Sequence, residues 1–131
     1  MRALLRRSFV PLLAWAVLLP ACRKAVDPGP NLVVHSEISP LPPKVGSATV
    51  MLDLSDASAK PVGGASIVLE AVMSHPGMAP VFGGSTEVAP GRYSGNLAFS
   101  MAGDWVVLLH MKLAEGTKVE RQIDVKGVRA N

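Results

Sequence analysis

Cysteine is nearly absent from this chain: Cys22 is the only one in 131 residues. A lone cysteine cannot form a disulfide within the chain, so no internal disulfide framework holds this fold together. Cysteine and histidine also lack the spacing of a zinc site. The sequence has no Gly-x-Ser-x-Gly elbow and no glycine-rich loop that opens a helix. These absences argue against catalysis, and we predict that the protein is not an enzyme.

Beyond the first few residues, the chain has no excess of positive or negative charge. The formal net charge is +3, from 13 basic and 10 acidic residues. Arg2, Arg6 and Arg7 carry this excess, so the chain from Arg23 onward is close to neutral. A neutral chain without charge runs does not indicate a nucleic-acid partner.

A long hydrophobic run is missing as well. The apolar stretch 9–20 is shorter than the roughly 20 residues that a membrane-spanning helix needs. It follows three arginines and precedes Leu19-Pro-Ala-Cys22, which resembles the lipobox of bacterial lipoproteins. We therefore expect a signal peptide over 1–21 and a lipid anchor on Cys22. The alternative for Cys22 is an unmodified thiol.

The residues that follow Cys22 are typical of a tether. Residues 22–31 contain Asp27-Pro-Gly-Pro30, a composition that favours an extended or flexible linker. We expect it to lift a domain, residues 32–127, off the periplasmic face of a membrane, with 128–131 as a tail. Arg23 stands where some lipoproteins kept at the inner membrane have aspartate, which favours the outer membrane.

The predicted domain consists of strands. Apolar and polar residues alternate in one stretch after another, and no stretch beyond the signal shows capped helical periodicity, which excludes an α/β fold. Turn formers separate the stretches, as in Ala89-Pro-Gly91. About seven short strands at this spacing favour an all-β, antiparallel, immunoglobulin-like sandwich, with Trp105 in its core. The expected strands are 32–38, 47–54, 65–73, 81–88, 92–99, 103–113 and 117–125.

One segment between two strands combines soft metal ligands. It reads Met73-Ser-His75-Pro-Gly-Met78. Thioether sulfur and imidazole nitrogen select copper, above all Cu(I). Proline and glycine can bend the chain so that His75 and Met78 converge. Methionine is also an ordinary core residue, so Met73 completing its strand and Met78 capping the sandwich remain the alternative.

A site on this loop needs another ligand from elsewhere. Met101 lies in the turn before the most apolar strand, and His110 lies on that strand. Neighbouring strand residues point to opposite faces, so a core-facing Trp105 sends His110 outward. The candidate metal ligands are Met73, His75, Met78, Met101 and His110.

Four motifs in order resemble the YtkA-like family, which is related to FixH-type proteins. They are Met73-Ser-His-Pro-Gly-Met-Ala-Pro-Val81, Ala89-Pro-Gly-Arg-Tyr93, Met101-Ala-Gly-Asp-Trp105 and Arg121-Gln-Ile-Asp-Val125. Lys60-Pro-Val-Gly-Gly-Ala65 fits too, so the resemblance covers roughly residues 40 to 126. It implies an extracytoplasmic β-sandwich, often on a lipid anchor or one membrane helix, broadly similar to small copper carriers such as CopC. A FixH-type protein would keep a membrane helix in place of the lipoprotein signal.

Two functions follow as hypotheses. The first is a membrane-anchored module that holds or carries copper through Met and His side chains. FixH-type relatives are linked to assembly of copper-containing respiratory oxidases, which implies such an assembly partner by analogy. The second is a structural or interaction lipoprotein of the cell envelope without a metal, which would contact its partner through a loop or an edge strand.

Overall fold

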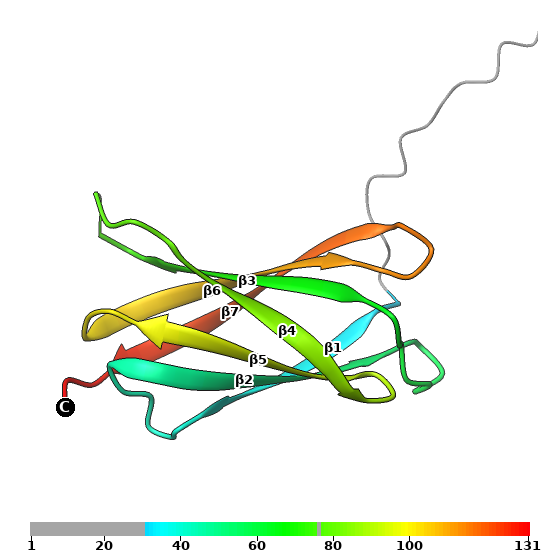
Figure 1. The fold of residues 1–131 in the computed structure, drawn as a ribbon, viewed down its shortest axis with the longest axis horizontal. Helices are drawn as coiled ribbons and strands as arrows, with labels where there is room; N and C mark the ends of the chain where they lie inside the picture. The colour runs from blue at the N-terminus through cyan, green and yellow to red at the C-terminus, as the bar shows by residue number, and fades with distance from the viewer. Residues whose placement is uncertain (1–30, 76) are drawn as a thin grey trace, which may run out of the picture.

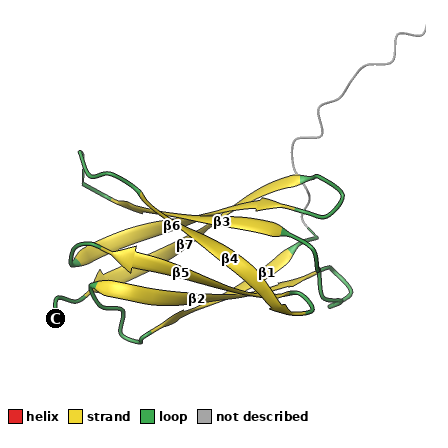
Figure 2. Cartoon of the chain, in the orientation of Figure 1, coloured by secondary structure: helices red, strands yellow, loops and turns green. Residues whose placement is uncertain are grey.

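The computed structural model describes residues 31–75 and 77–131. The predicted signal peptide, Cys22 and nearly all of the predicted tether lie outside the described residues. Strands and loops make up the whole described part, as Figure 2 shows. Within it, no helix has the length and apolarity needed to cross a membrane.

Seven strands form, each within a few residues of its predicted bounds. Every connection contains the proline, glycine or small polar residues that end strands. The strands are β1 (Val33–Ser39), β2 (Gly46–Ser55), β3 (Ser66–Met73), β4 (Val81–Ala89), β5 (Arg92–Phe99), β6 (Gly103–Lys112) and β7 (Lys118–Val128).

The strands form one antiparallel sheet that folds back on itself into two layers. Its order is β1-β2-β5-β4-β3-β6-β7. One layer holds β1, β2 and β5, the other holds β3, β6 and β7, and β4 joins them (Figure 1). In immunoglobulin lettering these layers are A-B-E-D and C-F-G, the constant-type arrangement. The predicted immunoglobulin-like sandwich is therefore confirmed, here without a disulfide and with its tryptophan on the sixth strand.

Strand β4 turns the corner between the layers at its two glycines. Gly83 and Gly84 still pair with β3, whereas Ser85 pairs with Gly95 of β5. A Cβ atom on Gly83 would lie 1.9 Å from the backbone oxygen of Asn96, so only glycine fits there. The close approach that glycine permits lets one strand serve both layers.

The core lies between the layers, and every buried residue in the described part of the chain is hydrophobic. Alternation puts every second residue of each central strand inside. Trp105 is 1% exposed, and its ring centroid lies 5.4 Å from that of Phe99. The buried residues are Ala48, Val50, Leu52, Leu54, Ile67, Leu69, Ala71, Tyr93, Leu97, Phe99, Trp105, Val107, Leu109, Met111, Val119, Val125 and Val128.

The C-terminal residues continue the fold beyond the predicted domain. Strand β7 runs to Val128, whose side chain is buried. Arg129 follows: its N–H donates to the carbonyl of Pro43, and its carbonyl accepts from Val45 N–H. The start of the segment 128–131 is thereby held against the β1–β2 connection.

Candidate functional site

Two loops lie at the same end of the sandwich. Met73, the last residue of β3, pairs with Trp105 near the start of β6. The β3–β4 loop (74–80) and the β5–β6 loop (100–102) are therefore both at this end, at the left of Figure 1. We call these two loops together with Met73 the sulfur end, because they carry three methionines: Met73, Met78 and Met101.

Met73 forms the base of the sulfur end. Its side chain is half-buried and packs against the core. Its methyl carbon lies 3.1 Å from the point where a Cβ of Gly103 would stand. The indole N–H of Trp105 donates to the carbonyl of Met101 at 3.0 Å, which holds the β5–β6 loop on the core. Met73 thus contacts the strand start that directly follows the Met101 loop.

The other donors at this end face solvent. Met78 is 39% exposed and Met101 is 48% exposed, and His75 is exposed as well. Gly77 has a φ of +86°, a conformation that side chains disfavour, so glycine suits this bend. Two thioethers and one imidazole on two loops are therefore open to a ligand from solution.

His110 does not lie at the sulfur end. It pairs with Val68 and Glu120, five residues along β6 from Trp105, which corresponds to roughly 17 Å at about 3.4 Å per residue. Sequence reasoning grouped it with the loop methionines because it could not determine the register. The predicted outward direction of His110 is confirmed by the core positions of Leu109 and Met111 on either side.

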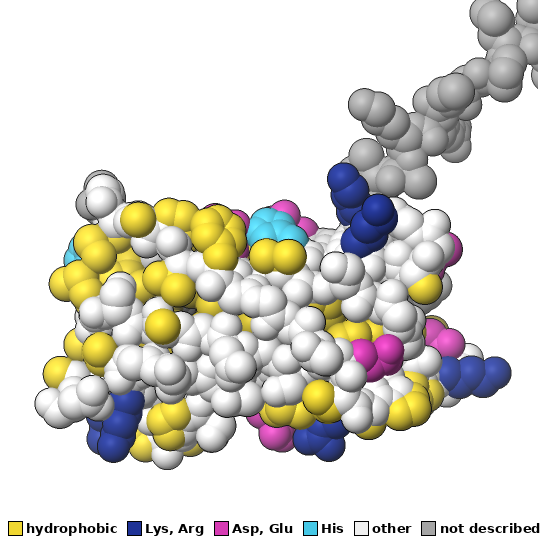
Figure 3. Space-filling view, in the orientation of Figure 1, with side chains coloured by type: hydrophobic (Ala, Val, Ile, Leu, Met, Phe, Trp, Pro, Cys, Tyr) yellow, Lys and Arg dark blue, Asp and Glu magenta, His cyan; other side chains and the backbone are white. Residues whose placement is uncertain are grey.

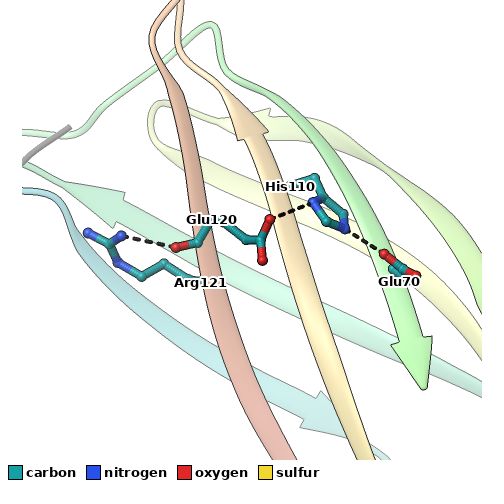
Figure 4. A network of polar contacts seen from close by, with 4 residues as sticks. All are labelled: Glu70, His110, Glu120 and Arg121. Carbon is teal, nitrogen blue, oxygen red and sulfur yellow. Dashed lines mark hydrogen bonds and ion pairs between the residues drawn. The ribbon is translucent and has the colours of Figure 1, made fainter. Parts of the chain in front are cut away.

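Two carboxylates flank the His110 ring (Figure 4). Its Nε2 lies 2.7 Å from Glu70 Oε2, and its Nδ1 lies 3.2 Å from Glu120 Oε2. Carboxylate oxygens accept hydrogen bonds, so both ring nitrogens can donate only when the imidazole is protonated. Both ring nitrogens are thus directed at carboxylates of the same face and not at the sulfur end. Sequence reasoning missed this cluster, because its three members come from β3, β6 and β7.

The opposite end of the sandwich contains a polar network that sequence reasoning also missed. We call it the braced end; its loops are 56–65, 90–91 and 113–117. The hydroxyl of Tyr93 donates to the carbonyl of Val62 at 2.8 Å and accepts from Ala65 N–H at 3.1 Å. Burial raises the pKa of this hydroxyl.

Glu87 completes the braced end from strand β4. Its carboxylate accepts hydrogen bonds from the backbone N–H groups of Gly64 and Gly91, each at 3.1 Å. These two donors lower the pKa of Glu87, because they stabilise the charged form. The network joins the long β2–β3 loop to the β4–β5 turn, a role for which the local sequence has no signal.

The sulfur end has the chemistry of a soft-metal site rather than a hard one. Across the described residues, no group of three or more His, Cys, Asp or Glu is placed to hold a metal ion. Any first-row metal held at the sulfur end would therefore depend on thioether ligands, and these favour Cu(I). Met78, Met101 and His75 fit that ion by donor type and by exposure.

Comparison with known proteins places the chain in a family. The fold is similar to that of the PmoD soluble domain from Methylocystis sp. ATCC 49242 (Rockwell), with a TM-score of 0.50 and 11% identity over 79% of this chain and 94% of that one. Murine CRIg matches with a TM-score of 0.43 and 10% identity over 76% of this chain and 98% of that one. No curated protein sequence matches the chain. The sequence model of one family covers residues 33–110, more than half of the chain and both loops of the sulfur end, and the chain belongs to that YtkA-like family.

Proposed function

We propose that this protein is a membrane-anchored, extracytoplasmic binding module that holds Cu(I) at the sulfur end. The observation that carries the proposal is the exposure of Met78 and Met101 on two loops at the same end of the sandwich. Methionine is usually a core residue, so two exposed thioethers at one place call for a role other than packing. Family membership supports a binding module.

The proposed ligand set combines two exposed sulfurs with one imidazole. Met78 and His75 come from the β3–β4 loop, and Met101 comes from the β5–β6 loop. Met73 lies below them and can contribute a third thioether from the core side. The copper, when bound, would be carried and not used for chemistry, since an open loop surface exchanges an ion readily. His110 has no part in this set.

A Cu(I) titration tests the proposal. The purified protein is titrated anaerobically with Cu(I) against a chromogenic chelator, and we expect about one ion per chain. The double variant Met78→Ala/Met101→Ala should lose this binding, and His75→Ala should weaken it. The matched controls are Met51→Ala on β2 and His35→Ala on β1, which remove the same side-chain types far from the sulfur end.

Two results contradict the copper proposal. One is the absence of Cu(I) binding by the unaltered protein. The other is unchanged binding in the double variant, which would move the site away from the sulfur end. Circular dichroism of each variant separates a lost ligand from a lost fold.

The proposed anchor is the lipid on Cys22, after removal of residues 1–21. Mass spectrometry of the membrane fraction should find Cys22 as the acylated first residue of the mature protein. Cys22→Ser should abolish this modification and release the domain from the membrane. Recovery of an unmodified Cys22 within a longer chain would contradict the anchor.

An envelope interaction without a metal is the second candidate, and the open side of the sandwich favours it. Edge strands β1 and β7 leave a groove of about 790 Å³ between them, lined by Ile38, Leu41 and Ile123 among others. Such edges accept an extended segment of a partner. Crosslinking in intact cells from a photoreactive group at Leu41 should then capture one specific envelope protein, for example in oxidase assembly. Failure to do so while copper binds favours the first candidate.

A further inference from the structure

The outer face of the layer formed by β3, β6 and β7 with the first half of β4 is unusually apolar. Phe82 is 62% exposed and Val68 is 44% exposed. Half-buried Val72 on β3 and half-buried Val106 and Leu108 on β6 belong to the same face. Figure 3 shows hydrophobic side chains gathered along the upper edge of the molecule, over β3 and the start of β4. We call this surface the outer face. The copper proposal makes no use of it.

The polar side chains in the middle of the outer face already have partners. Glu70, His110 and Glu120 form the cluster described above, with contacts of 2.7 Å and 3.2 Å (Figure 4). Paired polar groups are less costly to cover than unpaired ones, because their hydrogen bonds persist after desolvation. The cluster therefore permits contact with another protein surface.

On the outer face, the exposed ring of Phe82 lies near a glycine, Gly84. Phe82 and Gly84 are two residues apart on β4, so they point to the same side. Phe82 pairs with Glu70, and Gly84 pairs with Val68 one step along. A Cβ atom on Gly84 would meet nothing within 4 Å, so the surface is open there. Suppose that a second copy packs face to face on this surface, related by a two-fold axis that lies in the plane of contact and runs across the strands. If the axis passes midway between these two residues, each Phe82 lies over the Gly84 of the other copy.

The charges at the two ends of the outer face suit the same axis. Asp124 pairs with Val106 toward one end of the layer, and Lys118 pairs with Lys112 at the other end. A two-fold axis across the strands exchanges the ends, so Asp124 of one copy faces Lys118 of the other. The same residues serve on both sides, as an isologous interface requires.

We propose that two copies of this chain associate through the outer face as an antiparallel, face-to-face dimer. Three strand spacings of about 4.8 Å and six residues of about 3.4 Å give a face of roughly 14 by 20 Å. This is small beside a standard interface of about 1,600 Å². The dimer is accordingly weak and reversible, with a dissociation constant of micromolar order or above.

Sedimentation equilibrium over a wide concentration range tests the dimer. The unaltered protein should shift from monomer to dimer as its concentration rises. Phe82→Ser should raise the dissociation constant at least about tenfold, since a protruding aromatic anchor is lost. Val88→Ser is the matched control, because Val88 is 57% exposed on the half of β4 that pairs with β5. An equal effect of both variants, or a monomer up to roughly 1 mM, overturns the proposal.

A charge exchange tests the orientation. Lys118→Glu and Asp124→Lys should each weaken the dimer, because each puts like charges face to face. The two changes together restore opposite charges and should restore the dimer. Absence of this recovery overturns the antiparallel arrangement. Copper binding is measured on the same variants and should stay unchanged, which keeps this test independent of the sulfur end.

Discussion

The two ends of the sandwich differ in how their loops are held. At the braced end, the side chains of Tyr93 and Glu87 form four hydrogen bonds with backbone groups of two loops. At the sulfur end, one side-chain hydrogen bond among the described residues, from the Trp105 indole to the carbonyl of Met101, holds a loop. The loops of the braced end are thus fixed by side-chain hydrogen bonds, whereas the loops of the sulfur end expose polarisable side chains to solvent.

This difference indicates where function can reside at little cost in stability. Loops on a rigid scaffold carry binding residues, because their side chains add few contacts to the core. Met78 and Met101 have that position, and Trp105 and Met73 supply the base beneath them.

Trp105→Ala should have the largest effect. The side chain is 1% exposed and contacts Phe99, so its removal leaves a cavity in the core below the sulfur end. We expect the free energy of unfolding to fall by about 3–5 kcal/mol, measured by denaturant titration. Val88→Ala, at an exposed position, should change it by less than about 0.5 kcal/mol. A small effect of Trp105→Ala would show that this side chain does not stabilise the core beneath the sulfur end.

Tyr93→Phe tests the braced end. The ring stays in the core, but the N–H of Ala65 and the carbonyl of Val62 lose their partner. We expect a loss of about 1–2 kcal/mol in the free energy of unfolding. Faster hydrogen exchange of the Ala65 amide would locate the loss in the β2–β3 loop.

Glu87 should make the braced end sensitive to acid. Its pKa in the folded protein is below the ordinary value of 4.5, because Gly64 and Gly91 donate to the carboxylate. The stabilisation is therefore complete above about pH 4.5 and is lost as the pH falls through the lowered value. Thermal unfolding midpoints from pH 7 to pH 3 should fall more steeply for the unaltered protein than for Glu87→Gln. Glu37→Gln on β1 is the control, and it should keep the steep profile.

The double variant Met78→Ala/Met101→Ala should have the smallest effect on stability. Both residues are exposed on loops, so the free energy of unfolding should change by no more than about 0.5 kcal/mol. Copper binding should nevertheless be lost. A large destabilisation would show that these methionines pack at the end of the sandwich, which is the alternative reading of the motif.

Much of the fold could be predicted because its pattern is local. Ala48, Val50, Leu52 and Leu54 stand at every second position of one strand, and all four are buried. The outward direction of His110 follows from the same rule. The partners of His110 could not be predicted, since β3, β6 and β7 are separated by up to 50 residues and share similar apolar patterns. Glu70 and Glu120 became neighbours of His110 only through the register of three strands.

The candidate site was predictable in part for the same reason. Met73, His75 and Met78 stand together in the sequence, and a loop was expected there. That Met101 shares their end and His110 does not depends on strand order. The positions of the strands and the buried face of each follow from the sequence, because alternation is a property of neighbouring residues. Which loops share an end and what surrounds His110 follow from the folded structure, because strand pairing depends on contacts among residues far apart in the chain.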